Sequence, residues 1–479
     1  MLLELLKDAV AVVPEGLPGI IKGVNADSRA IQKGEVFFAL PGQTVHGDKF
    51  VEQAAKRGAV AMVTDREPPA DPGIPVLVVD DVRAAYARAA ARTLAPQPEV
   101  AVAVTGTNGK TSVASFVRQI WAANGFAAAS VGTLGIETAS GLEAGQLTTP
   151  DALSLHRSLA ALKSKGVDHV ALEASSQGLD QRRVDGIRFQ AVGFTNLTDD
   201  HLEYHHGMEG YREAKLRLFK ELLIEGGSSV INTDDPEHMP FLFASLDRGA
   251  TLLTVGTEGA FFEISKIQNK GFGQLVTGRL VGEPVEFLLP LTGAFQVSNV
   301  AVALGMAMAT GAVKEKSIPA LNKLKGAKGR LELVAEHNGG AVFVDYAHTP
   351  DALKNALESL RPYAKGKLIV VFGAGGDRDK AKRPQMGAIA KDLADRVIVT
   401  DDNPRTENAA SIRAQILEAV GNAEEIGDRA EAIRAAVATI KPNDVVLIAG
   451  KGHEDYQIIG TLKHHFSDHQ VVLSALKGL

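Results

Sequence analysis

The segment that most constrains this chain is a glycine loop between a strand-like run and a helix-like run. Residues Val102 to Ser112 read Val-Ala-Val-Thr-Gly-Thr-Asn-Gly-Lys-Thr-Ser. The alternating valines before the loop predict a buried strand, and the run from Ser112 to Ala123 is compatible with a helix. A loop in this position lets backbone N–H groups surround phosphate oxygens, while the helix N-terminus adds positive potential. The segment therefore predicts phosphate binding.

Two side chains of the loop fit nucleotide chemistry. Lys110 can neutralise the β- and γ-phosphates, and the Thr111 hydroxyl can join a magnesium shell. The pattern G-x-x-x-x-G-K-[ST] is incomplete, because Val104 stands where its first glycine belongs. The alternative is a glycine turn that caps a helix and binds nothing. The correct spacing of Gly109, Lys110 and Thr111 after a strand favours phosphate binding.

Composition narrows the classes of protein. A chain of 479 residues suggests about three domains of ~150 residues each. The net charge of -6 gives no basic excess for nucleic acid. Cysteine is absent, which excludes disulfides, thiol nucleophiles and thiolate zinc sites. Met1–Asp8 lacks the basic region and long apolar core of a signal peptide, and no run of ~18 apolar residues predicts a membrane span.

The order of expected elements divides the chain into three blocks, which predict an α/β fold. Paired prolines in Ala95-Pro96-Gln97-Pro98 indicate a linker. We therefore expect domains over 1–95, 96–328 and 329–479. Strands are expected at 36–40, 60–64, 76–79, 169–172, 229–232, 342–344, 368–372, 397–400 and 445–449, with a small antiparallel insert at 261–289. Helices are expected at 82–94, 210–223, 351–360, 382–393, 410–420 and 430–440.

A second polar cluster follows the phosphate loop. Glu173 comes at the end of a predicted strand, where α/β folds place ligands. The stretch 194–205 then gathers acids and histidines, and Lys215 follows on a helix that begins near Met208. Glu173 and His201 could hold a second divalent ion beside the phosphates. A polar capping segment is the alternative, and these residues alone leave both interpretations open.

The chain resembles the Mur ligases of peptidoglycan synthesis over nearly its whole length. The motifs that carry the resemblance stand in family order: Thr105-Gly-Thr-Asn-Gly-Lys-Thr111, Glu173-x-Ser-Ser176, Phe194-Thr-Asn-Leu-x-x-Asp-His-Leu202, Gly329-Arg-x-Glu332 and Val344-Asp-Tyr-Ala-His-Thr-Pro350. Within the family, the resemblance is strongest to the enzymes that add the third residue of the stem peptide. It rests on Asp27-Ser-Arg29, Leu147-Thr-Thr-Pro150, Gly373–Asp379, Lys382-Arg-Pro384 and Gly450-Lys-Gly-His-Glu454.

The resemblance implies an ATP-dependent ligase with three α/β domains: an N-terminal UDP-binding domain, a central P-loop-type ATPase domain with a parallel sheet, and a dinucleotide-fold-like C-terminal domain. ATP would phosphorylate the D-glutamate side chain of UDP-N-acetylmuramoyl-L-alanyl-D-glutamate, and an amine would capture the acyl phosphate. The implied cofactors are two magnesium ions and a carbamate on Lys215 formed from CO2. We expect small-molecule partners only, a monomer and a cytoplasmic location.

The resemblance also implies roles for individual residues. The catalytic set is Lys110, Glu173, His201, Lys215 and Asp345, and the metal set is Thr111, Glu173, His201 and carbamylated Lys215. ATP would contact Gly106, Thr107, Asn108, Gly109, Lys110, Thr111, Asn299 and Arg330, the last in a hinge. The sugar peptide would contact Ser28, Gln43, Thr44, Val45, Thr148, Thr149, Ser175, Gln181 and Arg183. Turn or capping roles compete strongly for Ser28 and Gln43. Without the motif Tyr211-x-x-Ala-Lys215, a surface position would be favoured for Lys215.

The choice of amine depends on Asp402-Asn403-Pro404-Arg405, which follows a predicted strand. This pattern is the family's signature for meso-diaminopimelate, whose distal carboxylate a guanidinium can hold through two hydrogen bonds. L-Lysine would leave Arg405 without a counter-charge. Arg378, Gly450 and Glu454 would complete the pocket, with Glu454 pairing the distal ammonium. Asn-Pro also favours a β-turn, and a turn is compatible with ligand binding.

Two residues depart from the family pattern, and two rival functions stay open. Gln177 and Gln296 replace the usual His and Asn, which puts details of substrate and adenine contact in doubt. One rival is another amide ligase, such as a D-glutamate-adding, lysine-adding or folylpolyglutamate enzyme. The other is a P-loop regulator that hydrolyses ATP without any sugar-peptide acceptor.

Overall fold

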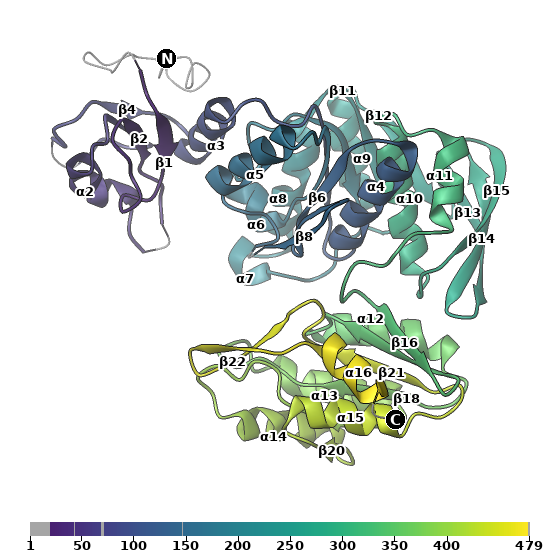
Figure 1. Cartoon of the computed structure of the whole chain (residues 1–479). Coiled ribbons are helices and arrows are strands. Elements are labelled where there is room, and N and C mark those ends of the chain that lie inside the picture. Colours follow the sequence, from purple (N-terminus) through teal and green to yellow (C-terminus); the bar gives the residue numbers. More distant parts are fainter. Residues whose placement is uncertain (1–19, 43, 69–70, 146, 478–479) are drawn as a thin grey trace. The chain divides into compact units, whose positions relative to one another are not determined.

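The structure is a computed structural model that describes residues 20–42, 44–68, 71–145 and 147–477 (Figure 1). Gln43 and the segment Met1–Asp8 lie outside the described residues. By contacts the chain divides into two compact units. The first comprises the described residues up to Ile264 together with Arg279–Glu283 and Ser298–Ala320, and the second comprises Ser265–Gly278, Pro284–Val297 and the described residues from Leu321 onward.

The first unit begins with a small parallel sheet. It contains β1 (Gly23–Asn25), β2 (Glu35–Phe38), β3 (Ala61–Thr64) and β4 (Val76–Val78), paired in that order. The short helices η1 (Gly47–Phe50) and α2 (Val51–Lys56) precede β3, and α3 (Val82–Thr93) follows β4. Asp81 caps α3 by accepting a hydrogen bond from the Ala84 backbone N–H. The two central strands are buried along their whole length, as expected for a parallel sheet.

An eleven-stranded sheet follows, in the order β15-β14-β13-β12-β11-β10-β5-β9-β6-β7-β8. Its strands are β5 (Val100–Thr105), β6 (Ala128–Gly132), β7 (Gly135–Thr138), β8 (Gly141–Ala144), β9 (His169–Glu173), β10 (Phe189–Phe194), β11 (Leu223–Asn232), β12 (Thr251–Gly256), β13 (Phe262–Lys270), β14 (Gly273–Leu280) and β15 (Glu283–Leu289). The helices are α4 (Lys110–Asn124), α5 (Ala152–Ser164), α6 (Ser176–Asp180), α7 (Leu202–His205), α8 (Met208–Arg217), α9 (His238–Asp247), α10 (Phe295–Met308) and α11 (Lys314–Leu321).

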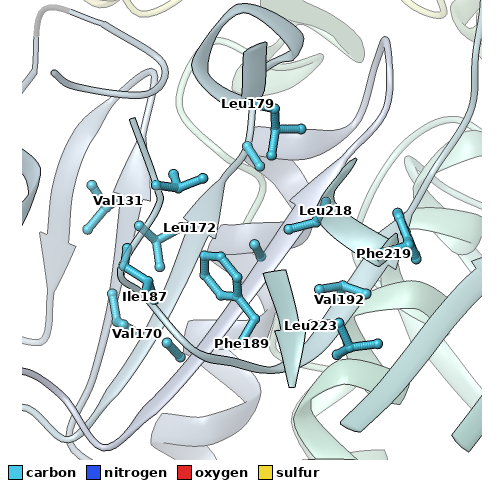
Figure 2. Close-up of a cluster of buried hydrophobic side chains, with 14 of the residues drawn as sticks. Val131, Val170, Leu172, Leu179, Ile187, Phe189, Val192, Leu218, Phe219 and Leu223 are labelled. Carbon is cyan, nitrogen blue, oxygen red and sulfur yellow. The ribbon is translucent and has the colours of Figure 1, made fainter. Parts of the chain in front are cut away.

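The phosphate-loop strand β5 lies inside this sheet, paired in parallel with β9 and β10. Figure 2 shows the buried cluster beside it, which contains Leu172 of β9, Phe189 of β10 and Leu223 of β11 together with Leu218. The expected insert corresponds to β13, β14 and β15. Neighbouring strands joined by two residues, as β13 and β14 are, can only run antiparallel, so this prediction is confirmed.

The second unit carries a six-stranded sheet in the order β16-β17-β21-β18-β19-β20. The strands are β16 (Glu332–His337), β17 (Gly340–Asp345), β18 (Leu368–Phe372), β19 (Arg396–Val399), β20 (Glu424–Glu425) and β21 (Val445–Ala449), and only β16 runs antiparallel to its neighbour. The hairpin β22 (Tyr456–Ile459) and β23 (Leu462–His465) forms a separate sheet. The helices are α12 (Pro350–Leu360), η3 (Arg361–Tyr363), α13 (Lys382–Leu393), α14 (Ala409–Val420), α15 (Arg429–Ala438) and α16 (Asp468–Lys477).

Alternate residues of the strands build two cores, one on each face of this sheet. Ala341 and Phe343 of β17 join the core with α12, α13 and α14, whereas Val342 and Val344 join the core with α15 and α16. A mostly parallel sheet covered by helices on both faces agrees with the expected dinucleotide-fold-like α/β domain. The expectation of an α/β fold built on parallel sheets is therefore confirmed.

One expected helix is confirmed nearly to its end, but its helix type changes partway along. The sequence predicts a helix over 210–223, but α8 ends at Arg217, a π-helical turn covers Leu218–Leu222, and β11 begins at Leu223. Leu218, Phe219 and Leu223 are all fully buried. The wider turn brings these apolar side chains into the central core, a tertiary demand that the local pattern does not encode.

No helix in the described part of the chain is long and apolar enough to cross a membrane.

Candidate active site

The phosphate loop is tightly enclosed by its neighbours. Gly106 and Gly109 adopt φ angles of 148° and 87°, conformations that favour glycine. A Cβ added at Gly106 would lie 1.9 Å from Thr195 Oγ1, and one added at Gly109 would lie 2.3 Å from Asn299 Oδ1. Both glycines are thus required by conformation and by space, and the loop leads directly into the N-terminus of α4.

The segment after β10 holds the loop in place. The Thr107 N–H donates to Asn196 O at 2.9 Å, and the Asn108 N–H donates to Asn196 Oδ1 at 2.9 Å. The Thr195 hydroxyl donates to Asn108 O at 2.6 Å. Thr195 and Asn196 belong to a family motif in which the sequence suggests chemical roles only for the acids and histidines. Their contacts assign the segment a structural role in shaping the loop.

Two lysines converge on the carbonyl oxygen of Gly106. Lys110 Nζ donates to Gly106 O and Thr107 O, each at 2.8 Å, and Lys215 Nζ donates to Gly106 O at 2.7 Å. Lys215 is only 1% exposed and lies 4.4 Å from the centre of the Tyr211 ring. Burial, together with the nearby Lys110 charge, holds the pKa of Lys215 well below its usual range. Among the described carboxylates, none forms an ion pair with it.

Glu173 is a buried carboxylate beside the start of α4. It accepts hydrogen bonds from the Thr111 hydroxyl at 2.9 Å, from the Thr133 N–H at 2.8 Å and from the Thr133 hydroxyl at 3.2 Å. The Thr133 hydroxyl also lies 2.9 Å from that of Thr148. Hydroxyl and carboxylate oxygens are the ligands that magnesium prefers, so Thr111 and Glu173 fit such an ion.

His201 does not complete this set. Its side chain is 52% exposed and lies 3.6 Å from Asp200 Oδ2. Within residues 20–42, 44–68, 71–145 and 147–477, no group of three or more His, Cys, Asp or Glu side chains could hold a metal. The predicted pairing of Glu173 with His201 on one ion therefore stays a prediction.

A connected set of polar side chains extends from Glu173. The Thr149 hydroxyl donates to Glu173 O at 2.8 Å and lies 3.0 Å from Ser175 Oγ, which caps α6. Arg183 Nη1 donates to Thr149 O at 2.7 Å, and its Nη2 donates to Gln181 Oε1 at 2.8 Å. The structure thus brings Thr149, Ser175, Gln181 and Arg183 together, as the resemblance implies. Tyr204, whose hydroxyl accepts from Gln181 Nε2 at 2.9 Å, was not expected.

The expected sugar-peptide contacts Ser28, Thr44 and Val45 lie in the region of the small N-terminal sheet. Ser28 is buried, and its hydroxyl donates to Gln53 Oε1 at 2.7 Å. Thr44 and Val45 are exposed in a turn that the Gly42 N–H closes onto Val45 O. The bond to Gln53 gives Ser28 a structural partner, and the ligand role of all three residues stays a prediction.

In the second unit, Asp345 ends β17 and organises the chain around it. Its Oδ2 accepts from the Leu331 N–H at 2.6 Å, and its Oδ1 accepts from the Ala347 N–H at 2.8 Å. Enclosure by the protein raises the pKa of Asp345, and the Arg330 charge opposes that rise. The Arg330 guanidinium stacks 4.7 Å from the centre of the Tyr346 ring. Arg330 and Asp345 therefore lie close together, whereas Asn299 belongs to the first unit.

The turn containing Arg330 also meets the segment Gly450–Glu454. A Cβ added at Gly329 would lie 2.3 Å from the carbonyl carbon of Gly452. Both glycines have positive φ angles, 66° and 53°. Glu332 Oε2 accepts the Gly329 N–H at 2.7 Å and pairs with His469 Nε2 at 2.7 Å. Two separate stretches of sequence are thus packed backbone to backbone.

The proposed amine pocket forms where Asp402–Arg405 follows β19. Asn403 Nδ2 donates to Glu454 Oε2 at 3.0 Å, and Arg405 Nη1 donates to Gly376 O at 2.7 Å. A Cβ added at Gly450 would lie 2.6 Å from Asp402 Oδ2. The structure therefore brings Asp402, Asn403, Arg405, Gly450 and Glu454 together.

Arg378 and Pro404 flank the same pocket. A Cβ added at Gly375 would lie 2.9 Å from Arg405 Nη1 and 3.9 Å from Arg378 Cγ, so both arginine side chains approach this glycine. Arg378 is exposed, and its guanidinium donates to the backbone oxygen of Asp377. Pro404 is buried.

Two residues of this pocket were not predicted. Lys451 Nζ donates to Asn403 Oδ1 at 3.1 Å and to Glu454 Oε2 at 3.0 Å, and Gln457 Nε2 donates to Asp402 O at 2.6 Å. The only sequence signal for Lys451 is its place in Gly-Lys-Gly-His-Glu. Nothing in the local sequence around Gln457 indicates its role, because its partner is distant along the chain.

Comparison with known proteins places three stretches of the chain in one family. Residues 20–94 match the Mur ligase family catalytic domain, residues 104–307 match the Mur ligase middle domain, and residues 329–452 match the Mur ligase glutamate ligase domain. A Brucella melitensis protein named UDP-N-acetylmuramoyl-L-alanyl-D-glutamate–2,6-diaminopimelate ligase is 52% identical over 95% of this chain and 94% of its own length.

Solved structures agree with this result. A structure titled as UDP-N-acetylmuramoyl-L-alanyl-D-glutamate–2,6-diaminopimelate ligase aligns with a TM-score of 0.75 at 33% identity, covering 100% of this chain and 98% of that one. The MurF ligase from Thermotoga maritima in complex with ADP aligns with a TM-score of 0.62 at 20% identity, covering 95% of this chain and 97% of that one. The second likeness concerns the fold alone.

Proposed function

The chain belongs to the Mur ligase family, and from that membership we propose that it joins meso-2,6-diaminopimelate to UDP-N-acetylmuramoyl-L-alanyl-D-glutamate. It is an ATP-dependent, amide-bond-forming ligase of peptidoglycan precursor synthesis. The proposal assigns the UDP-sugar to residues 1–95, ATP to residues 96–328 and the amine to residues 329–479. The residues for each substrate are those named from the family motifs.

The observation that carries the proposal is the chemistry of the amine pocket. Arg405 supplies a guanidinium on one side, and Glu454 supplies a carboxylate that Asn403 Nδ2 holds at 3.0 Å. The distal end of meso-diaminopimelate carries one carboxylate and one ammonium, so it complements both groups. L-Lysine has the ammonium but lacks the carboxylate, and it would leave Arg405 without a counter-charge.

The reaction requires two anions to approach each other. A carboxylate oxygen of the D-glutamate side chain attacks the γ-phosphorus of ATP, the bond to the ADP oxygen breaks, and an acyl phosphate forms. The neutral amine of diaminopimelate then attacks the acyl carbon, phosphate leaves, and the nitrogen loses a proton as the amide forms. Lys110 and the N-terminus of α4 supply positive charge where the phosphates meet the carboxylate.

Thr111 and Glu173 would hold magnesium, because their oxygens are adjacent at 2.9 Å and suit a hard cation. A bound magnesium ion would neutralise phosphate charge during the transfer. The assignment of His201 to the same ion rests on the family motif alone.

Lys215 would carry the carbamate. Its low pKa supports a neutral amine, which is the form that adds to CO2, and its burial excludes competing solvent. The carbamate would give the site an anion near the start of α4. Lys215→Ala should therefore lose most ligase activity while nucleotide still binds. Lys220→Ala is the matched control, because Lys220 is 46% exposed and forms an ion pair with the exposed Glu213. Full turnover by the Lys215 variant would reject its catalytic role.

Release of ADP tests the proposed function directly. We expect rapid release only when the sugar-dipeptide acceptor and meso-diaminopimelate are both present, and little release with L-lysine. Arg405→Ala should weaken selection of diaminopimelate over lysine by about tenfold or more, since a charged hydrogen-bonded pair contributes roughly 1.5–3 kcal/mol. A preference for lysine would identify a lysine-adding ligase, and ADP release without any acceptor would identify a P-loop ATPase.

A further inference from the structure

Lys451 contacts residues of the proposed amine pocket, but the reaction described above assigns it no role. Its side chain is 0% exposed, and its Nζ lies 5.5 Å from the centre of the Tyr456 ring. Burying an ammonium is unfavourable unless its donors and charge are satisfied. Lys451 meets that condition through Glu454 Oε2 at 3.0 Å and Asn403 Oδ1 at 3.1 Å, with Asp402 Oδ1 at 3.8 Å.

These contacts fix the orientation of the Asn403 amide. Its Oδ1 accepts from Lys451 Nζ at 3.1 Å and from the Ile458 N–H at 2.9 Å. With Oδ1 engaged by two donors, Nδ2 is turned to donate to Glu454 Oε2 at 3.0 Å. A flipped amide would place its NH2 group against both donors, so Lys451 and Ile458 together exclude that state.

The same contacts divide the two oxygens of Glu454. Oε2 accepts from both Lys451 Nζ and Asn403 Nδ2, each at 3.0 Å. Among the residues that the structure describes, the contact of Oε1 is a long hydrogen bond from the Tyr456 hydroxyl, at 3.4 Å. Oε1 is therefore the oxygen with capacity left for a ligand ammonium.

We propose that Lys451 is a positioning residue that orients Glu454 and Asn403 and thereby sets the affinity for the distal end of the diamino acid. The inference rests on the proposed function, because that function supplies the ligand. Lys451 does not touch the reacting carboxylate or amine. It acts by anchoring one oxygen of Glu454 and by balancing the carboxylates of Glu454 and Asp402.

The test compares Lys451→Met with Lys463→Met in the full-length chain. Lys463 is a matched control, because its Nζ lies 4.3 Å from the centre of the same Tyr456 ring but its side chain is exposed. We expect Lys451→Met to raise the KM for meso-diaminopimelate about 10- to 100-fold, the loss typical of charged hydrogen bonds. The KM values for ATP and for the sugar-dipeptide acceptor should stay within about twofold, and Lys463→Met should leave all three unchanged.

A double-mutant cycle separates positioning from general support of the fold. In a Glu454→Gln background, Lys451→Met should raise the KM for diaminopimelate much less, since the charge that Lys451 anchors is gone. Lys451→Gln, which keeps a donor, should show an intermediate rise.

Three results would overturn the inference: equal rises in all three KM values, a diaminopimelate KM that does not change, or additive effects in the cycle. Failure of both Lys451 variants to fold would also reject it in favour of a purely structural role. Wild-type protein that does not use diaminopimelate would instead refute the proposed function, so the two failures are distinguishable.

Discussion

Substituting alanine at Gly109 tests whether the shape of the phosphate loop controls nucleotide binding. Gly109 caps the N-terminus of α4 with a φ of 87°, and Gly125 caps the C-terminus of the same helix with a φ of 96°. A Cβ at Gly109 would lie 2.3 Å from Asn299 Oδ1, whereas a Cβ at Gly125 meets nothing within 4 Å. The two glycines share a backbone conformation and differ in their surroundings.

The magnitudes follow from that difference. Alanine in a left-handed conformation costs roughly 1–2 kcal/mol at either position. Gly109→Ala adds a steric cost of about 1–3 kcal/mol, because a separation of 2.3 Å forces Asn299 or the loop to move. Displacing the loop by a fraction of an ångström also misaligns its N–H groups. We therefore expect Gly109→Ala to bind ADP at least ~10-fold more weakly and Gly125→Ala to bind it normally.

Isothermal titration with ADP and thermal unfolding together decide the outcome. Both variants should unfold at a lower temperature, and only Gly109→Ala should lose affinity. Adding Asn299→Ala to Gly109→Ala should recover part of the lost stability, because it removes the clash but leaves the backbone cost. Unchanged ADP affinity in Gly109→Ala, or an equal loss in Gly125→Ala, would refute the reasoning.

Two further predictions concern stability. Arg217→Met should lower the free energy of unfolding by about 3–5 kcal/mol, because it leaves Asp185 buried without its partner at 2.6 Å. Lys56→Met should change the free energy of unfolding by less than ~0.5 kcal/mol, since the side chains of Lys56 and Glu52 are 80% and 81% exposed. Urea denaturation of both variants measures these changes, and equal losses of stability would contradict the prediction. Burial lowers the pKa of His156 from 6.5 to about 4. Between about pH 6.5 and pH 4 the ring therefore stays neutral in the folded protein but is protonated in the unfolded chain. Stability should therefore fall by roughly 3 kcal/mol as the pH drops from 6.5 to 4, and His156→Gln should reduce that fall.

The sequence predicts the fold well where local patterns are strong. The strand, glycine loop and helix around Lys110 have the predicted order, and the strands of the six-stranded sheet alternate with helices along the chain as predicted. These elements follow from alternating apolar residues and from glycine or proline at their ends. The change from an α-helix to a π-helical turn at Leu218 was not predicted, because it accompanies the burial of Leu218 and Phe219 among residues distant along the chain.

The candidate site is predicted less completely, for a different reason. Motifs identify Glu173, Asn403 and Glu454, but the contacts that orient them come from residues distant along the chain. Thr133 is 40 residues from Glu173 in the sequence, and Lys451 is 48 residues from Asn403, yet each pair is hydrogen-bonded. The spacing of residues in a single sequence carries no information on such partners. For the same reason, the burial of Lys215 follows only from the fold and not from the pattern of its helix.

The close approach of Gly329 and Gly452 has a mechanical consequence. A methyl group does not fit between these two glycines. We therefore expect the backbone at Gly329 and the backbone at Gly452, next to Lys451, to move together. A rotation of the backbone at Gly329 would therefore displace Gly452 and its neighbour Lys451. If the diamino acid binds beside Lys451 as proposed, a rotation of the Gly329 peptide would therefore also move part of its binding site.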